Sequence, residues 1–255
     1  MGQAPFGVGD VVPVEFVEYP PTIRDVPGTP THQARRFGRI AGLGVGGLAV
    51  AVTRAEFGDV TRLAPVVASA VFDVRVSAFL VPDEDDRRRV SAEVARMLYV
   101  YPALSAGALW CTADRLAVAG WLRVNPDRPV PAAAQEATEL RRLVGRWFPR
   151  FERLAEMLAE VHATVADVPH DRLTVLAVHP DRQRRGVGSA LLAAHHAYLD
   201  GIGRPAYLDA AGAELVGFYA RFGYVEIGDP VRLPNRATLH PMWRTPTPTG
   251  EEQNR

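Results

Sequence analysis

A short glycine-containing junction between two regular segments most constrains how this chain can fold. Residues 173–178 form an apolar run rich in leucine and valine, typical of a buried strand, and residues 189–199 carry apolar side chains at helical spacing. Between them lies Gln183-Arg184-Arg185-Gly186-Val187-Gly188. Glycine permits a tight turn and leaves the first N–H groups of the following helix uncovered. Because those N–H groups and the helix dipole favour anions, the junction predicts a site for a phosphate or pyrophosphate.

Strands and helices alternate on both sides of this junction. We expect helices at 56–72 (kinked near Pro65), 84–102, 132–147, 150–166, 189–201 and 213–223. We expect strands at 48–55, 173–178, 205–210, 224–228 and 236–244, and a hairpin of 107–114 with 115–124 around Ala113-Asp114. Strand–helix alternation in the middle, with antiparallel hairpins outside it, predicts an α/β fold with a mixed sheet.

Length, charge and cysteine content exclude several classes of protein. The chain has 255 residues and 47% hydrophobic content, enough for one substantial core. Its formal net charge of zero gives no general attraction to nucleic acid or acidic membranes. No apolar run reaches the roughly 18 residues that a membrane-spanning helix needs. The lone Cys111, expected to pack in a strand, excludes an intrachain disulfide and a multi-cysteine metal site. We therefore expect no nucleic acid, membrane or metal partner.

The N-terminal 47 residues differ from the rest of the chain. They hold six prolines and nine glycines without a persistent pattern, so we expect an irregular or disordered extension at 1–47. A single domain at 48–245 and a disordered tail at 246–255 follow. Arg35-Arg36 and the apolar stretch ending at Ala49-Val50-Ala51 are similar to an export signal. The same stretch also suits a first core strand, or a leader from an upstream start codon. These alternatives stay open, and we expect a cytoplasmic protein.

Three stretches resemble a known family when they are taken together. They are "VHATVADVPHDRL" (161–173), "LAVHPDRQRRGVGSALL" (176–192) and "AYLDAAGAELVGFYARFGY" (206–224). The second contains a Gln/Arg-x-x-Gly-x-Gly/Ala loop, and the third ends in Phe-Tyr-x-x-x-Gly-Phe/Tyr. Over about residues 50–245 the chain resembles the GNAT superfamily of acetyl-CoA-dependent N-acetyltransferases. Its Pro169-His170 pair resembles a segment of the branch that includes puromycin N-acetyltransferase. A Rossmann fold would need a third glycine, and a P-loop would need Gly-Lys-Ser/Thr, neither of which is present.

The resemblance implies a GNAT fold and acetyl-CoA as cosubstrate. In that fold a mixed, mostly antiparallel sheet flanked by helices splays between its fourth and fifth strands, and the pantetheine arm lies in the gap. Leu176, Ala177 and Val178 would bind it through the backbone, and the Val178 N–H would face the thioester oxygen. Gly212 stands where many relatives carry a coenzyme-contacting Asn, so that contact is not implied here. The pyrophosphate would lie on Gln183, Arg184, Arg185, Gly186, Val187, Gly188 and Ser189.

The resemblance also implies direct attack of a neutral amine on the acetyl carbonyl. It makes Tyr219 the acid that protonates the departing thiolate, and Asp209 the best candidate for the base. The alternatives are that Tyr219 only packs its helix and that Asp209 caps the next helix or meets solvent. His162, His170 and His179 have ordinary pKa values suited to proton relay, but His162 fits a core position equally well and His179 a turn before Pro180.

The acceptor is expected to bind among the remaining elements. We expect its pocket to use the helix at 84–101 with Tyr99 and Tyr101, the helices at 130–165, and the C-terminal hairpin around His240. The predicted function is acetylation of a primary amine on a small molecule, with antibiotics among the candidates, by a monomer or homodimer. The alternatives are acetylation of a peptide or protein amine, and a catalytically silent acyl-CoA-binding domain. The presence of a tyrosine at 219 favours catalysis.

Overall fold

The structure is a computed structural model that describes residues 40–41, 50–105, 108–126 and 134–248. The predicted extension and tail therefore lie largely outside the described residues. Strand β1 (Ile40–Ala41) pairs with β2 (Ala51–Arg54), so the sheet already includes residues before 48. Beyond residue 245, the Thr247 N–H donates to the Asp200 carboxylate at 2.8 Å. No helix within these ranges combines the length and apolar character needed to cross a membrane.

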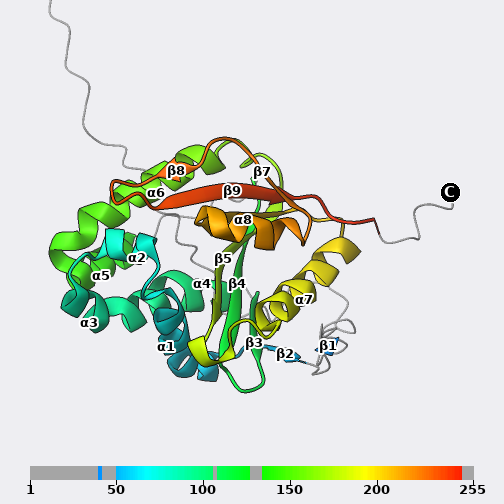
Figure 1. Cartoon of the computed structure of the whole chain (residues 1–255), viewed down its shortest axis with the longest axis horizontal. Coiled ribbons are helices and arrows are strands. Elements are labelled where there is room, and N and C mark those ends of the chain that lie inside the picture. The colour runs from blue at the N-terminus through cyan, green and yellow to red at the C-terminus, as the bar shows by residue number, and fades with distance from the viewer. Residues whose placement is uncertain (1–39, 42–49, 106–107, 127–133, 249–255) are drawn as a thin grey trace, which may run out of the picture.

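Within the described residues, nine strands form one mixed sheet (Figure 1). After β1 and β2 come β3 (Leu109–Thr112), β4 (Ala117–Val124), β5 (His170–Val178), β6 (Ala206–Ala211), β7 (Tyr224–Glu226), β8 (Val231–Arg232) and β9 (Thr238–Arg244). The order is β1-β2-β3-β4-β5-β6-β9-β7, with β8 paired to β9. Only β5 and β6 pair in parallel among these strands; the other pairs are antiparallel. The predicted mixed, mostly antiparallel sheet is confirmed.

Helices cover both faces of the sheet. They are α1 (Val60–Val71), α2 (Arg75–Leu80), α3 (Glu84–Ala95), α4 (Tyr101–Ser105), α5 (Ala134–Val144), α6 (Phe148–His162), α7 (Val187–Gly201) and α8 (Ala213–Ala220). Helices α1, α3 and α4 pack on one face of the central strands, and α7 packs on the opposite face with α8 (Figure 1). Helices α2, α3, α5 and α6 form a further cluster against β8 and β9. Cys111 lies fully buried in the core, as predicted.

The helices differ from the predicted ones in three places. Helix α1 begins at Val60, after a 3-10 turn at Phe57–Asp59, and it includes Pro65. The helix expected at 84–102 passes through a π turn at 96–100 before α4. Helix α2 was not predicted, since six residues are too few to show helical periodicity.

The parallel pair of β5 and β6 is short because the two strands separate. Their register joins residues 171–173 of β5 to 206–208 of β6. At Thr174 the register of β5 with β4 shifts, and the Thr174 hydroxyl donates to the Gly120 carbonyl at 3.1 Å. Such a bulge bends a strand and increases its twist. Beyond Leu173, β5 therefore has a strand partner only on its β4 side among the described residues, and a gap opens towards β6.

A candidate active site between two diverging strands

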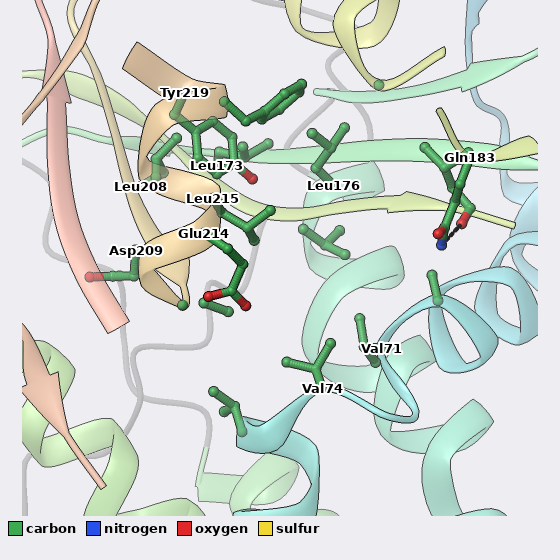
Figure 2. A pocket seen from close by; sticks show the side chains of 18 of the residues that line it. Val71, Val74, Leu173, Leu176, Gln183, Leu208, Asp209, Glu214, Leu215 and Tyr219 are labelled. Carbon is green, nitrogen blue, oxygen red and sulfur yellow. Dashed lines mark hydrogen bonds between the residues drawn. The ribbon is translucent and has the colours of Figure 1, made fainter. Parts of the chain in front are cut away.

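A cavity of about 1690 Å³ occupies the gap between β5 and β6. It is lined by residues from the α1–α2 connection, β5, the loop that leads into α7, the end of β6 with α8, and the start of β9. Figure 2 shows Gln183 on one side of this space and Asp209 on the opposite side, with Val71 and Val74 facing them from the α1–α2 connection. The cavity therefore has two ends, one at the glycine loop and one at Asp209, where β6 leads into α8.

The glycine loop has the backbone conformation of an anion-binding turn. Arg184 and Gly186 both adopt left-handed conformations, with φ of 59° and 75°. Left-handed residues alternating with right-handed ones turn successive N–H groups towards one concave face. The Ala190 N–H makes the first hydrogen bond of α7, to the Gly186 carbonyl at 3.0 Å. The N–H groups of residues 187–189 precede that bond, so they are available to an anion at the helix N-terminus.

Side chains fix the position of this loop against β5. The Gln183 amide donates to the Val178 carbonyl at 3.1 Å (Figure 2). A Cβ placed on Gly188 would lie in van der Waals contact with Leu176, Val178 and Phe218, at 3.7, 3.8 and 3.9 Å, so a larger side chain here would crowd these three residues. Eight of the ten residues expected to bind the coenzyme line the cavity: Leu176, Val178, Gln183, Arg184, Gly186, Val187, Gly188 and Ser189.

Two residues expected at the coenzyme site do not line the cavity. Ala177 is buried in the core cluster on the α1 face of the sheet, because side chains alternate along β5. Arg185 is exposed on the outer side of the loop. That Ala177 binds the pantetheine arm through its backbone therefore stays a prediction.

Tyr219 lies on α8 with its side chain in the cavity wall. Its ring packs edge-on against Phe218 and Tyr224, at centroid distances of 5.1 and 5.9 Å. The residue is 8% exposed, and Figure 2 shows its hydroxyl beside Leu173 and Leu215. Burial raises the pKa of Tyr219 above its ordinary value, so the hydroxyl stays protonated at neutral pH. No other described residue hydrogen-bonds this hydroxyl, which leaves its proton available to a ligand.

Asp209 lies on β6, directly after the point where β5 and β6 separate. Its Oδ2 accepts a hydrogen bond from Arg172 at 2.8 Å, and its Oδ1 accepts one from the Tyr207 hydroxyl at 2.6 Å. Burial and the neighbouring Asp209 carboxylate raise the pKa of Tyr207. The N-cap of α8 is Gly212, so the alternative that Asp209 caps that helix is wrong. Each oxygen of Asp209 retains a further lone pair with which to accept a proton.

The three histidines considered for proton relay lie outside the cavity lining. His170 Nδ1 donates to a backbone carbonyl at 2.7 Å, so its Nε2 accepts from His162 Nε2 at 2.9 Å. Burial lowers the pKa of both rings, that of His162 to about 3, and both are neutral at pH 7. His179 accepts from the Asp181 N–H at 3.4 Å in a turn. His162 therefore fits its core alternative and His179 its turn alternative.

The end of the cavity away from the glycine loop, where the acceptor is expected to bind, is called the acceptor end, and its lining differs from the prediction. Tyr99 lines it, but Tyr101 packs against Phe57 on the outer surface and is 45% exposed. Helices α5 and α6 pack in the cluster with β8 and β9 instead. His240 Nδ1 lies 2.7 Å from Oε1 of Glu226, a residue of β7 that is 14 positions away in sequence. The His240 ring is therefore hydrogen-bonded to β7. Among the described residues, therefore, helices α5 and α6 and His240 do not line the cavity.

Sequence reasoning missed two parts of this end. Residues at the α1–α2 connection, Val71 and 73–77, also line the cavity. These few residues carry no periodic pattern that would place them there. Glu214 in the first turn of α8 also lines the cavity. The signal for it was a carboxylate at a predicted helix start, which by itself indicates only a favourable interaction with the helix dipole.

Comparison with known proteins agrees with this geometry. Residues 154–226 match a family model described as acetyltransferase (GNAT) domain. A structure described as histone acetyltransferase HPA2 and related acetyltransferase, from Corynebacterium glutamicum, shares 21% identity at a TM-score of 0.57, covering 78% of this chain and 97% of that chain. Arylalkylamine N-acetyltransferase 2 from Aedes aegypti shares 11% identity at a TM-score of 0.55, covering 77% and 98%. An agmatine N-acetyltransferase shares 13% identity at a TM-score of 0.52, covering 76% and 98%. The chain therefore has the GNAT fold, and its residues 154–226 match the model of an acetyltransferase (GNAT) domain.

Proposed function

We propose that this protein is an acetyl-CoA-dependent N-acetyltransferase that acetylates a primary amine of a small molecule. One observation carries the proposal: a single cavity joins an anion-binding loop at the start of α7 to a buried, protonated tyrosine on α8. A donor with a phosphate group at one end and a reactive group at the other fits that arrangement. The GNAT domain match supports the same donor.

The residues of the cavity fit coenzyme A. The N–H groups at 187–189 would hold the pyrophosphate, and the edge of β5 that faces away from β4 would hydrogen-bond the pantetheine amides. Gln183 holds the loop against β5 while both contacts form. Acetyl-CoA supplies an acetyl group activated as a thioester.

Two residues then handle the protons of the transfer. The amine nitrogen attacks the acetyl carbon, and a C–N bond forms as the C–S bond breaks. Tyr219 gives its proton to the departing sulfur, and Asp209 accepts the proton that the nitrogen loses. Transfer of that proton through water from Asp209 to Tyr219 restores both groups. The products are the N-acetylated amine and coenzyme A.

We extend this proposal to a xenobiotic amine, such as an antibiotic, and to a cytoplasmic enzyme. The resemblance of Pro169-His170 to the puromycin N-acetyltransferase branch supports the substrate class. The apolar side chains of Val71, Val74 and Leu208 in the acceptor half of the cavity suit a substrate with an apolar body.

A thiol-release assay with acetyl-CoA tests the proposal. The amine panel contains puromycin-like nucleosides, aminoglycosides, polyamines and short peptides. We expect coenzyme A release above the no-amine control with at least one small-molecule amine. Release with peptides alone supports the peptide acetyltransferase alternative. Measured acetyl-CoA binding without release from any amine supports a silent coenzyme-binding domain.

A further inference from the structure

A second carboxylate, that of Glu214, faces the cavity in a different environment from Asp209. Figure 2 shows the Glu214 carboxylate directed into the space between α8 and Val74. No described residue forms a hydrogen bond or ion pair with it, whereas Arg172 and Tyr207 both hydrogen-bond Asp209. Glu214 is therefore the carboxylate of this wall whose charge is left for a ligand.

Gly212 permits this orientation of Glu214. It adopts φ of 119°, and a Cβ placed on it would lie 2.6 Å from Cδ of Glu214. Any side chain at 212 would displace the carboxylate from its present position. Gly212 thus explains how the Glu214 carboxylate folds back over the loop before α8 and still lines the cavity.

The position of Glu214 also has a purely structural interpretation. A carboxylate in the first turn of a helix interacts favourably with the helix dipole. That interaction depends on a charge near the helix N-terminus and on nothing in the cavity. A ligand role adds a dependence on the charge of the acceptor, which separates the two interpretations by experiment.

The surroundings define what Glu214 could bind. Of the labelled side chains around it in Figure 2, Leu208, Leu215 and Val74 are apolar and Asp209 is acidic. The cavity lining also contains arginines, and these are exposed to solvent, as Glu214 is: Arg75, Arg182, Arg184, Arg221 and Arg236. Glu214 and Tyr219 lie five positions apart on α8, so their side chains leave the helix about 140° apart. Figure 2 shows Leu215 between the Tyr219 hydroxyl and the Glu214 carboxylate, so a group bound at Glu214 is separate from an amine that reacts beside Tyr219.

We propose that Glu214 is a specificity residue that binds a second cationic group of the acceptor. The preferred substrate class is then a diamine or aminoalkyl cation, in which an apolar spacer separates the reacting amine from the second charge. This inference rests on the proposed acetyltransferase function, because it names the substrate class of the same site.

A matched pair of acceptors tests the inference. We compare kcat/KM for 1,5-diaminopentane with that for pentylamine, which has the same chain and lacks the second charge. Wild type should prefer the diamine. Glu214→Gln keeps the side-chain size and should lower that preference about tenfold or more, because the amide oxygen can still accept a hydrogen bond but the charge that pairs with the second ammonium group is lost. The KM for acetyl-CoA should not change.

Glu84→Gln is the matched control, since Glu84 is also a first-turn carboxylate and lies at the start of α3, outside the cavity lining. It should leave the preference at the wild-type value. An unchanged preference in Glu214→Gln overturns the inference. An increase in the KM for acetyl-CoA without a change in preference also overturns it, because Glu214 then contacts the coenzyme.

Calorimetric binding of the same two amines separates this inference from the proposed function. Absence of thiol release with every amine counts against the proposed function, and the binding titrations still test Glu214. Weaker diamine binding by Glu214→Gln than by wild type, by about tenfold, supports the inference. Equal binding by the two proteins, or no diamine binding by wild type, overturns it.

Discussion

The two ends of the cavity are built in different ways. The loop end comes from one continuous stretch, residues 173–189, and offers mainly backbone N–H groups to a ligand. The acceptor end comes from segments far apart in sequence, including residues 71–77, 208–214 and 236–239. Its chemistry resides in side chains, above all the carboxylates of Asp209 and Glu214.

This difference has a consequence for what each end tolerates. Every residue has a backbone N–H except proline, so the loop end depends on conformation and on the absence of Cβ atoms at particular glycines. The acceptor end depends on which side chains are present, so its specificity can change while the donor site stays intact. Substitutions at each end should therefore affect different kinetic constants.

Tyr219→Phe is expected to have the largest effect. The change removes one hydroxyl and keeps the ring, so α8 should still pack. Loss of a positioned general acid lowers the rate by roughly 10²–10⁴-fold. Single-turnover rates measure this, because slow product release would hide part of the effect. Tyr101→Phe, on the outer surface, is the control and should leave the rate unchanged. Wild-type rates in a folded Tyr219→Phe protein would remove Tyr219 from the mechanism.

The pH profile tests the same residue independently. An ordinary tyrosine has a pKa of about 10, and burial raises the pKa of Tyr219 above it. The neutral, proton-donating form therefore persists to higher pH than in a solvated phenol. Any loss of wild-type single-turnover rate due to Tyr219 should occur above pH 10. A decline that begins well below pH 10, and that is absent from Tyr219→Phe, contradicts this assignment.

Asp209→Asn should have the next largest effect. Loss of the proton acceptor is expected to lower the single-turnover rate roughly 10²-fold, at the lower end of the range for general-base catalysis. The variant also leaves Arg172 without its carboxylate partner, so thermal unfolding must be measured beside the rate. Asp167→Asn, at an exposed position, is the control. A variant that loses stability but keeps its single-turnover rate would make Asp209 a structural residue.

Gly188→Val should affect the other end of the cavity and a different constant. The branched side chain would crowd Leu176, Val178 and Phe218 next to the loop. We expect the Kd for acetyl-CoA to rise roughly 10–100-fold, as for loss of one or two hydrogen bonds to a charged group. The preference between amines should not change. Gly201→Val, at the opposite end of α7 with nothing near its Cβ, is the control. An unchanged Kd in a folded variant would move the coenzyme site elsewhere.

The sequence predicts the loop end well because its determinants are local. The apolar run before the loop predicts β5, the glycines predict the turn, and the leucines after it predict α7. All three lie within one continuous stretch, and so does the anion site that they form. The Phe218-Tyr219 signature similarly places Tyr219 on a helix after a strand.

The acceptor end was predicted poorly because its determinants are long-range. Arg172 and Asp209 are 37 residues apart, and the parallel register of β5 and β6 brings them together. No pattern in either strand specifies that register. Tyr99 and Tyr101 are near neighbours in sequence, yet one lines the cavity and the other lies outside it, after a π turn at 96–100 that alters the helical phase. Side-chain identity alone could not distinguish them.

Thr174→Val tests the boundary between the two ends and should have the smallest effect. Thr174 lies at the bulge where β5 leaves β6, and its hydroxyl donates to the Gly120 carbonyl. Loss of this hydrogen bond should destabilise the protein by about 1 kcal/mol. For a chain of this size, that corresponds to a fall in Tm of roughly 2–4 °C.

Because valine keeps the shape of threonine and suits a strand, β5 and β6 should still separate in Thr174→Val. The Kd for acetyl-CoA and the preference between amines should then stay within about twofold of wild type, a difference smaller than one weak hydrogen bond. Thr61→Val, on the exposed side of α1, is the control and should leave Tm unchanged. A more than tenfold change in both constants without loss of stability would show that the bulge acts on both ends at once. The two ends would then be one coupled site, and the separation between a backbone-built donor end and a side-chain-built acceptor end would fail.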